Sequence, residues 1–280
     1  MIELVTHLAD PSDPDQRFAR RALANMWRHT SGDAGKSQSP LLADTESQLA
    51  HSFFRTDVNE RAAESTLMIT ALQAMTRNDT EALPPEMAPL LQHLSDHVRQ
   101  REARFAGDML AIVRAIDPTS TDWRVFAKDA VRRGAVLNFM RSQAVLEVLA
   151  STRISSIAAQ FGASTVPSEL RAMTASLIRH FPTPLFFFRN LLVGLIESGT
   201  NFSASKHANS IWDVQLAFGV SPEATVDGKP LVLVTNEKRI HRAATDGGHG
   251  MFVMDMQRYR VAVASGSIVQ SAAELPPPSA

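Results

Sequence analysis

The chain of 280 residues contains no cysteine. Disulfide bonds, zinc sites built from thiolates and a thiol nucleophile are therefore excluded. The sequence also lacks a strong excess of either charge, because 28 Lys and Arg residues face 29 Asp and Glu residues. The net charge of −1 provides no overall attraction to nucleic acid or anionic lipid, although a local basic groove is compatible with it.

A long apolar segment is missing as well. The most apolar stretch, residues 184–196, contains Arg189 and Asn190 and is shorter than the roughly 20 residues that span a bilayer. We expect this stretch to form a buried helix. The N-terminal residues lack the basic start and the long apolar run of a signal peptide. These observations predict a cytoplasmic protein that has no membrane partner.

Helical periodicity dominates the chain as far as residue 198. The exception is the apolar run at residues 2–9, which we expect to form a short strand ending at Asp10. Asp13 or Asp15 can cap the helix that follows. Further on, the pattern predicts helices to about residue 30 and at residues 44–54, 59–75, 85–116 (as one helix or two), 121–151, 167–179 and 184–198.

The middle of the helical region carries a local excess of positive charge. Residues 99–153 contain ten Lys or Arg and six Asp or Glu, which gives an excess of four positive charges. One interpretation is an ordinary solvated helix surface. The other interpretation is a surface that contacts the phosphates of a nucleic acid.

The pattern changes to alternating helices and strands after Gly199. We expect helices at residues 211–218 and 238–244 and strands at 231–234 and 251–254. The apolar run 231–234 is typical of a strand buried on both faces of a parallel sheet, and the alternation predicts βαβ connectivity.

Two carboxylates stand out in this C-terminal region. Asp213 lies on the first expected helix, and Glu237 follows the first expected strand. In open α/β sheets, ligands bind beyond the carboxyl ends of the strands, where Glu237 is expected to lie. Two acidic groups from separate elements can share a divalent cation.

Residues 207–260 resemble the C-terminal half of a PIN-domain (PilT N-terminus-like) ribonuclease. The resemblance rests on Asn209 and Asp213, on the apolar strand that ends at Thr235, on Glu237, and on the small residues that end the next helix. Asp213 matches the helical metal-binding acid of the family. Glu237 stands where the family usually has Asp. The resemblance implies an α/β fold, a PIN-like parallel-sheet sandwich with a large, mostly α-helical insertion.

The same resemblance implies a metal-dependent endoribonuclease that hydrolyses phosphodiester bonds of RNA, and the family suggests a toxin or a defence effector. The catalytic residues would be Asp10, Glu46, Asp213 and Glu237, of which Asp10, Asp213 and Glu237 would bind the metal. Mg²⁺ or Mn²⁺ suits such oxygen ligands and can activate water. Asn209, four residues before Asp213, would support the site by orienting that carboxylate or a bound water.

The N-terminal acids allow two alignments with the family. In the first, Asp10 follows the apolar run 2–9, and Glu46 is the second acid. In the second, Asp44 is the first acid and Glu64 the second. We prefer the first alignment. Each C-terminal residue also has a structural interpretation, because Asn209 can cap a helix, and Asp213 and Glu237 each suit the first turn of a helix, where the helix dipole favours an acid.

The expected organisation has four parts. Residues 1–56 are the N-terminal part of the α/β core, 57–200 the helical insertion, 201–265 the C-terminal part of the core and 266–280 a disordered tail. Two other functions stay open. One is a catalytically degenerate PIN-like protein that binds RNA or a protein partner through its helical region. The other is a mainly helical structural protein that forms homo-oligomers.

Overall fold

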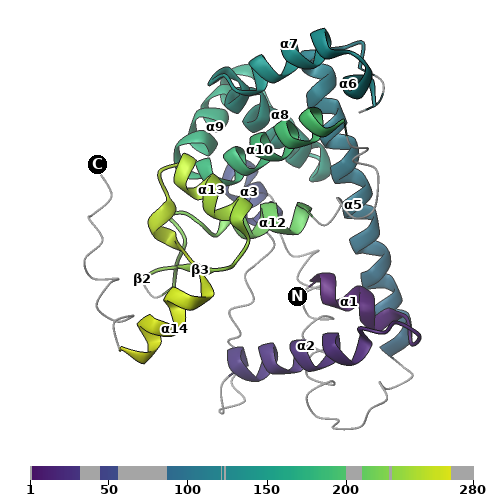
Figure 1. The fold of residues 1–280 in the computed structure, drawn as a ribbon, viewed down its shortest axis with the longest axis vertical. Helices are drawn as coiled ribbons and strands as arrows, with labels where there is room; N and C mark the ends of the chain where they lie inside the picture. Colours follow the sequence, from purple (N-terminus) through teal and green to yellow (C-terminus); the bar gives the residue numbers. More distant parts are fainter. Residues whose placement is uncertain are drawn as a thin grey trace. The chain divides into compact units, whose positions relative to one another are not determined.

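The computed structural model describes residues 2–31, 45–55, 87–120, 122, 124–199, 210–226 and 229–265. Helices make up most of these residues, and the strands in them are four segments of two residues each. The chain divides into two compact units, Met1–Phe105 and Ala106–Ala280. Figure 1 follows the course of the chain.

The first unit contains α1 (Ile2–Ala9), α2 (Gln16–Ser31), α3 (Thr45–Phe54) and the start of α5 (Ala88–Ile116). Helices α1 and α2 pack against each other, and Leu8, Ala19 and Leu23 are buried. Ala19 and Leu23 are four residues apart and therefore lie on the same face of α2. This packing determines where the turn between α1 and α2 lies.

The boundary between the two units falls within α5. Its buried apolar residues in the first unit are Leu91, Leu94, Val98 and Phe105, at intervals of three, four and seven residues. Such intervals produce one apolar stripe along a helix. In the second unit the buried residues of α5 are Met109, Ile112 and Val113.

The second unit is built around α10 (Pro182–Ser198), which contacts α6 (Val125–Lys128), α7 (Ala130–Met140), α8 (Ala144–Gln160), α9 (Pro167–His180), α12 (Ser210–Phe218) and α13 (Lys238–Asp246). Helix α10 begins with a proline, as many helices do, and it is followed by Gly199 in the left-handed conformation (φ 61°). A Cβ atom at Gly199 would lie 2.6 Å from the Cβ atom of Ala127, so a larger residue would not fit there.

Two short strand pairs accompany these helices. Strands β1 (Thr225–Val226) and β2 (Lys229–Pro230) are antiparallel. Strands β3 (Leu233–Val234) and β4 (Val253–Met254) are parallel, with α13 and the 3₁₀ turn η2 (Gly250–Phe252) between them. Helix α14 (Met256–Ala264) follows β4, and Asp255 caps it by accepting a hydrogen bond from the Arg258 backbone N–H.

The predicted PIN-like parallel-sheet sandwich is wrong. In the described residues the parallel sheet is reduced to the β3–β4 pair, and the protein is mainly helical. The apolar run 231–234 is not buried on both faces, because Val232 is 41% exposed and its neighbours are half-buried. An apolar run of four residues does not by itself determine how many strands surround it.

Residues 2–9 form helix α1 and not the predicted strand. The apolar residues Leu4, Val5, Leu8 and Ala9 recur at intervals of four, which fits a helix. The same run also contains a partial alternation of apolar and polar residues, and eight residues are too few to separate the two periods. The change matters for the site, because a helix and a strand place His7 differently relative to the residues that follow.

Most helix predictions agree with the structure, with one clear exception. The predicted helix 121–151 is interrupted and appears as α6, α7 and α8. Asp129 starts α7 by accepting a hydrogen bond from the Arg132 backbone N–H at 2.9 Å, and such caps separate consecutive helices. The predicted helix 59–75, the tail 266–280 and the alternative acids Asp44 and Glu64 lie outside the described residues.

Two further expectations concern the chain as a whole. None of the helices in the described parts of the chain combines the length and the apolar character that crossing a membrane requires. The four-part organisation stays a prediction, since residues 57–86 and 200–209 are outside the described ranges. Within the second unit, α10 from the expected insertion makes its most extensive packing contact with α13 from the expected C-terminal part.

Candidate metal centre

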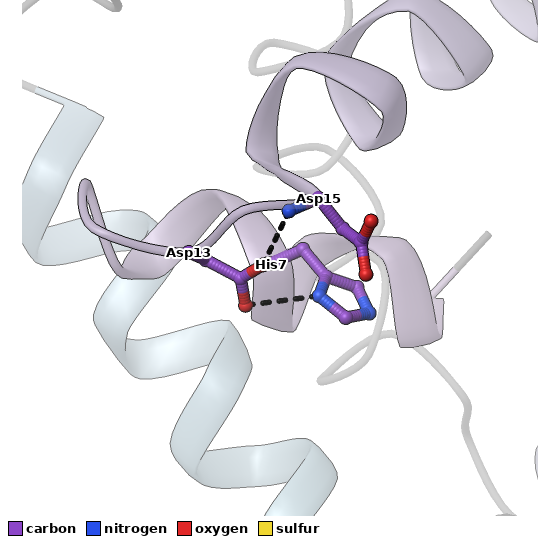
Figure 2. A group of neighbouring side chains, drawn as sticks. All are labelled: His7, Asp13 and Asp15. Atoms are coloured by element: carbon purple, nitrogen blue, oxygen red, sulfur yellow. Dashed lines mark hydrogen bonds and ion pairs between the residues drawn. The ribbon is translucent and has the colours of Figure 1, made fainter.

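Three side chains that can bind a metal ion meet at the turn between α1 and α2. His7 lies in the last turn of α1, and Asp13 and Asp15 lie in the loop before α2. One ligand atom from each of them lies within 4.8 Å of the other two. Figure 2 shows the three side chains gathered at this turn. Across the described residues, this is the group of three or more His and acidic side chains that meets the geometric requirement.

The turn itself holds Asp13 in place. One carboxylate oxygen of Asp13 accepts a hydrogen bond from the Asp15 backbone N–H at 2.8 Å. The other oxygen lies 3.0 Å from Nδ1 of His7. His7 and Asp13 are half-buried, whereas Asp15 is exposed. A side chain that a backbone hydrogen bond already orients loses less conformational entropy when it binds an ion. Asp13 is therefore the best preorganised ligand of the three.

The ligand set suits a divalent ion that accepts both nitrogen and oxygen. Imidazole is a good ligand for Zn²⁺ and other transition metals, and carboxylates also suit Mg²⁺ and Mn²⁺. Two atoms bound to one ion at about 2.1 Å each lie at most about 4.2 Å apart. The spacing of up to 4.8 Å is slightly wider, and a small rotation of the exposed Asp15 side chain would close it. Three protein ligands leave positions for water or a substrate.

Asp10 lies in the same turn but uses its carboxylate differently. Its Oδ1 accepts hydrogen bonds from the backbone N–H of Ser12 at 2.9 Å and from the Ser12 hydroxyl at 2.7 Å. The hydroxyl bond and then the backbone bond lower the pKa of Asp10. Asp10 belongs to no described group of three potential metal ligands. Its predicted role as a ligand stays a prediction, and in this turn it shapes the backbone.

The second N-terminal acid, Glu46, lies in the first turn of α3. Its side chain is outside the described residues. Asp10 and Glu46 belong to the first unit, whereas Asp213 and Glu237 belong to the second. The predicted cluster of four acids therefore stays a prediction. Asn209, the predicted supporting residue, also lies outside the described residues.

The structure does bring the two C-terminal acids together, and an arginine connects them. Nη2 of Arg239 lies 3.0 Å from Oδ2 of Asp213, and its Nε lies 3.0 Å from Oε1 of Glu237. Asp213 comes from the first turn of α12. Glu237 caps α13 by accepting a hydrogen bond from the Arg239 backbone N–H at 3.1 Å. Two of the predicted metal ligands therefore contact one guanidinium group.

The guanidinium changes what these two carboxylates can do. Its hydrogen bond with Glu237 is the main reason that the pKa of Glu237 lies below its usual value. The same guanidinium fastens α12 to α13, since it pairs with an acid from each side. A metal ion would have to displace Arg239 before it could bind both acids. Glu237 is the N-cap of α13 and does not lie in its first turn, where the structural interpretation expected it, and the metal role of the pair stays a prediction.

Sequence patterns do not point to His7, Asp13 and Asp15 as a group. Asp13 and Asp15 are interpreted there as helix caps, and His7 lies in the run that is predicted as a strand. The available signal is a His followed by two acids six and eight residues later, across the turn formed by Pro11 and Pro14. That signal becomes informative only when residues 2–9 are recognised as a helix that packs against the next one.

Comparison of the chain with models of protein families, with curated proteins and with solved structures gave no match.

Proposed function

We propose that this protein binds one divalent metal ion through His7, Asp13 and Asp15 and uses it to hydrolyse phosphodiester bonds of RNA. The observation that supports metal binding is the approach of the three ligand atoms to within 4.8 Å. A neutral imidazole and two carboxylates provide two negative charges for the ion. This ligand set favours Mn²⁺ or Zn²⁺ over Mg²⁺, which prefers oxygen.

The hydrolytic part of the proposal follows from the chemistry of such a centre. A divalent ion with three protein ligands can lower the pKa of a bound water and stabilise negative charge on a phosphate. The exposed position of Asp15 leaves the site accessible from solvent. The choice of RNA as the substrate rests on the resemblance of residues 207–260 to PIN-domain ribonucleases. The cytoplasmic location expected from the sequence belongs to the same proposal, and cell fractionation tests it.

A titration of the purified full chain with Mn²⁺ tests the metal site. Calorimetry should detect one ion for each chain. The variants His7→Gln and Asp13→Asn should weaken binding at least tenfold, because each removes one of three ligands. The matched control is Asp10→Asn, which changes an acid of the same turn that is not part of the cluster. Equal affinity in the wild type and Asp13→Asn would refute the site.

An RNA cleavage assay tests the hydrolytic part separately. Cleavage of a labelled single-stranded RNA should require Mn²⁺ or Zn²⁺, stop with a chelator and fall at least 100-fold in Asp13→Asn. If the metal binds at His7, Asp13 and Asp15 and cleavage does not occur, the protein is a metal-binding protein without this activity. If neither occurs, the whole proposal fails.

A second candidate is a protein that acts by binding a partner or a second copy of itself, and α14 favours it. Every described residue of α14 is at least partly exposed, including Tyr259, Val261 and Val263. Short helices gain most of their stability from packing an apolar face. Sedimentation of the wild type and of Val263→Glu at several concentrations tests self-association. If the protein is a monomer at all concentrations, self-association is refuted, and α14 would then bind a different partner.

A further inference from the structure

A small pocket with a basic rim lies between α10 and α13. It has a volume of about 90 Å³ and is lined by Phe187, Asn190 and Leu191 of α10 and by Arg239 and Arg242 of α13. Both helices belong to the second unit, and Figure 1 shows them next to each other. Sites for whole small molecules are usually several hundred Å³. This pocket therefore has room for a single chemical group.

The floor of the pocket is apolar and its rim carries charge. Phe187 is almost completely buried, and Leu191 is buried as well. The guanidinium carbon of Arg239 lies 5.8 Å from the centre of the Phe187 ring. Charged groups interact more strongly next to apolar surface than in open water. An anion in this pocket would therefore be attracted more strongly than one on an ordinary exposed surface.

Arg242 is the charge at the rim that pairs with no acid among the described residues. Arg239 is paired with Asp213 and Glu237, and Arg189 lies 3.4 Å from Asp246. Arg242 is exposed and makes no hydrogen bond or ion pair with any side chain that the structure describes. Of the residues that line the pocket, the charged ones are Arg239 and Arg242, and both are positive.

Arg242 also acts on a neighbouring guanidinium. Burial lowers the pKa of Arg189, Asp246 raises it, and repulsion by Arg242 lowers it further. An anion beside Arg242 would offset this repulsion. Asp246 also accepts a hydrogen bond from the Asn190 amide at 3.1 Å, so the acid is already shared by two donors.

We propose that the pocket between α10 and α13 binds a phosphate group, through Arg242 and Arg239 with Asn190 as an additional donor. Donors from two helices suit a tetrahedral anion with several oxygens better than a planar carboxylate with two. The ligand is either a small phosphate compound or one phosphate of an RNA chain. The site goes beyond the proposed function, because it uses none of the metal ligands and lies in the other unit.

The test uses the full chain labelled with ¹⁵N and titrated with sodium phosphate, followed by NMR. The reference is sodium chloride at equal ionic strength. Phosphate should shift the amide signals of residues 187–191 and 239–242. The variant Arg242→Gln should weaken phosphate binding about tenfold, as expected for the loss of one charge-assisted hydrogen bond. Because Arg242 has no described partner, this variant should keep the wild-type melting temperature.

The matched control is Arg171→Gln. Arg171 is an exposed arginine on α9 that does not line the pocket. Its replacement changes the net charge by the same amount and should leave phosphate binding as it is in the wild type. The proposal is overturned if chloride produces the same shifts, or if Arg242→Gln binds phosphate as well as the wild type does.

A second titration with an oligonucleotide of six uridines identifies the source of the phosphate. If the oligonucleotide binds more than tenfold more tightly than inorganic phosphate and Arg242→Gln removes that gain, the pocket binds a phosphate of an RNA chain. If the oligonucleotide binds no more tightly, the ligand is a small phosphate compound. In either case, binding of Mn²⁺ to the wild type and to Arg242→Gln should be the same, which separates this site from the metal centre.

Discussion

The turn between α1 and α2 and the contact between α12 and α13 both bring two carboxylates together. In the turn, an imidazole lies 3.0 Å from one of the two acids, and the ligand atoms of all three residues lie within 4.8 Å. In the contact, a guanidinium lies 3.0 Å from each acid. A neutral imidazole can share a metal ion with the acids, whereas a guanidinium takes the place of the ion. The side chain beside a pair of acids therefore decides whether the acids can bind a metal ion or instead hold two helices together through an ion pair.

The largest expected effect is the loss of metal binding at the turn between α1 and α2. With free Mn²⁺ at 100 times its dissociation constant, binding to the native state alone adds about 2.7 kcal/mol to the free energy of unfolding. Asp13→Asn should lose this gain, although its amide oxygen can still accept the Asp15 backbone hydrogen bond. Asp213→Asn should keep it. Melting curves with and without Mn²⁺ measure both, and the opposite pattern would move the metal site to the second unit.

A smaller effect is expected when Arg239 is replaced. Arg239→Gln leaves Asp213 and Glu237 close together without their cation, and it should reduce the free energy of unfolding by about 1 kcal/mol, as for exposed ion pairs that form a small network. The same variant should gain stability from Mn²⁺ even when Asp13→Asn is also present. Urea unfolding measures both effects.

The control for this experiment is Arg171→Gln, which removes an exposed arginine without described ion pairs. If Arg239→Gln in the Asp13→Asn background shows no response to Mn²⁺, the two C-terminal acids are not placed to share an ion.

Acid titration tests the ion pair between Arg239 and Glu237 at the contact between α12 and α13. The pKa of Glu237 in the folded protein is below its usual value of 4.5, chiefly because of the hydrogen bond with Arg239. Its stabilising contribution is therefore complete above pH 4.5 and is lost as the pH falls through the lowered value. In Arg239→Gln the pKa should rise toward 4.5. NMR titration of the Glu237 carboxyl carbon measures this pKa. An unchanged pKa in Arg239→Gln would contradict Arg239 as the cause of the lowering.

The smallest effect separates Asp10 from its neighbours in the turn. Ser12→Ala removes the hydroxyl that contributes most to lowering the pKa of Asp10, so this pKa should rise toward 3.8. The gain in melting temperature with Mn²⁺ should stay as in the wild type, since Asp10 is not part of the cluster. A reduced response to Mn²⁺ in Ser12→Ala would show that the hydrogen bonds of Asp10 also position the ligands.

The helices could be predicted from the sequence where a long apolar stripe specifies them. The intervals between Leu91, Leu94, Val98 and Phe105 indicate α5, and the apolar run that ends near Ile196 indicates α10. The sheet could not be predicted in the same way, because the run 231–234 is equally compatible with a central strand and with a two-residue strand at the surface. The number of neighbouring strands decides between these two structures, and that number depends on parts of the chain that are distant in the sequence.

The candidate metal centre was harder to predict than the helices. Asp213 and Glu237 are prominent in the sequence, and the structure does place them around one group, but that group is Arg239. The pattern cannot show that an arginine two residues after Glu237 reaches back to both acids. His7, Asp13 and Asp15 depend on an eight-residue helix whose period is ambiguous in the sequence. A wrong assignment of that helix hides the cluster.

Pulsed electron paramagnetic resonance of the protein with one equivalent of Mn²⁺ tests the central claim most directly. A ligated imidazole couples its nitrogen to the electron spin of the ion. We predict this nitrogen signal in the wild type, its loss in His7→Gln and its retention in His241→Gln, which changes a histidine of the second unit. The absence of the signal in the wild type, or its retention in His7→Gln, would contradict a metal centre at His7, Asp13 and Asp15.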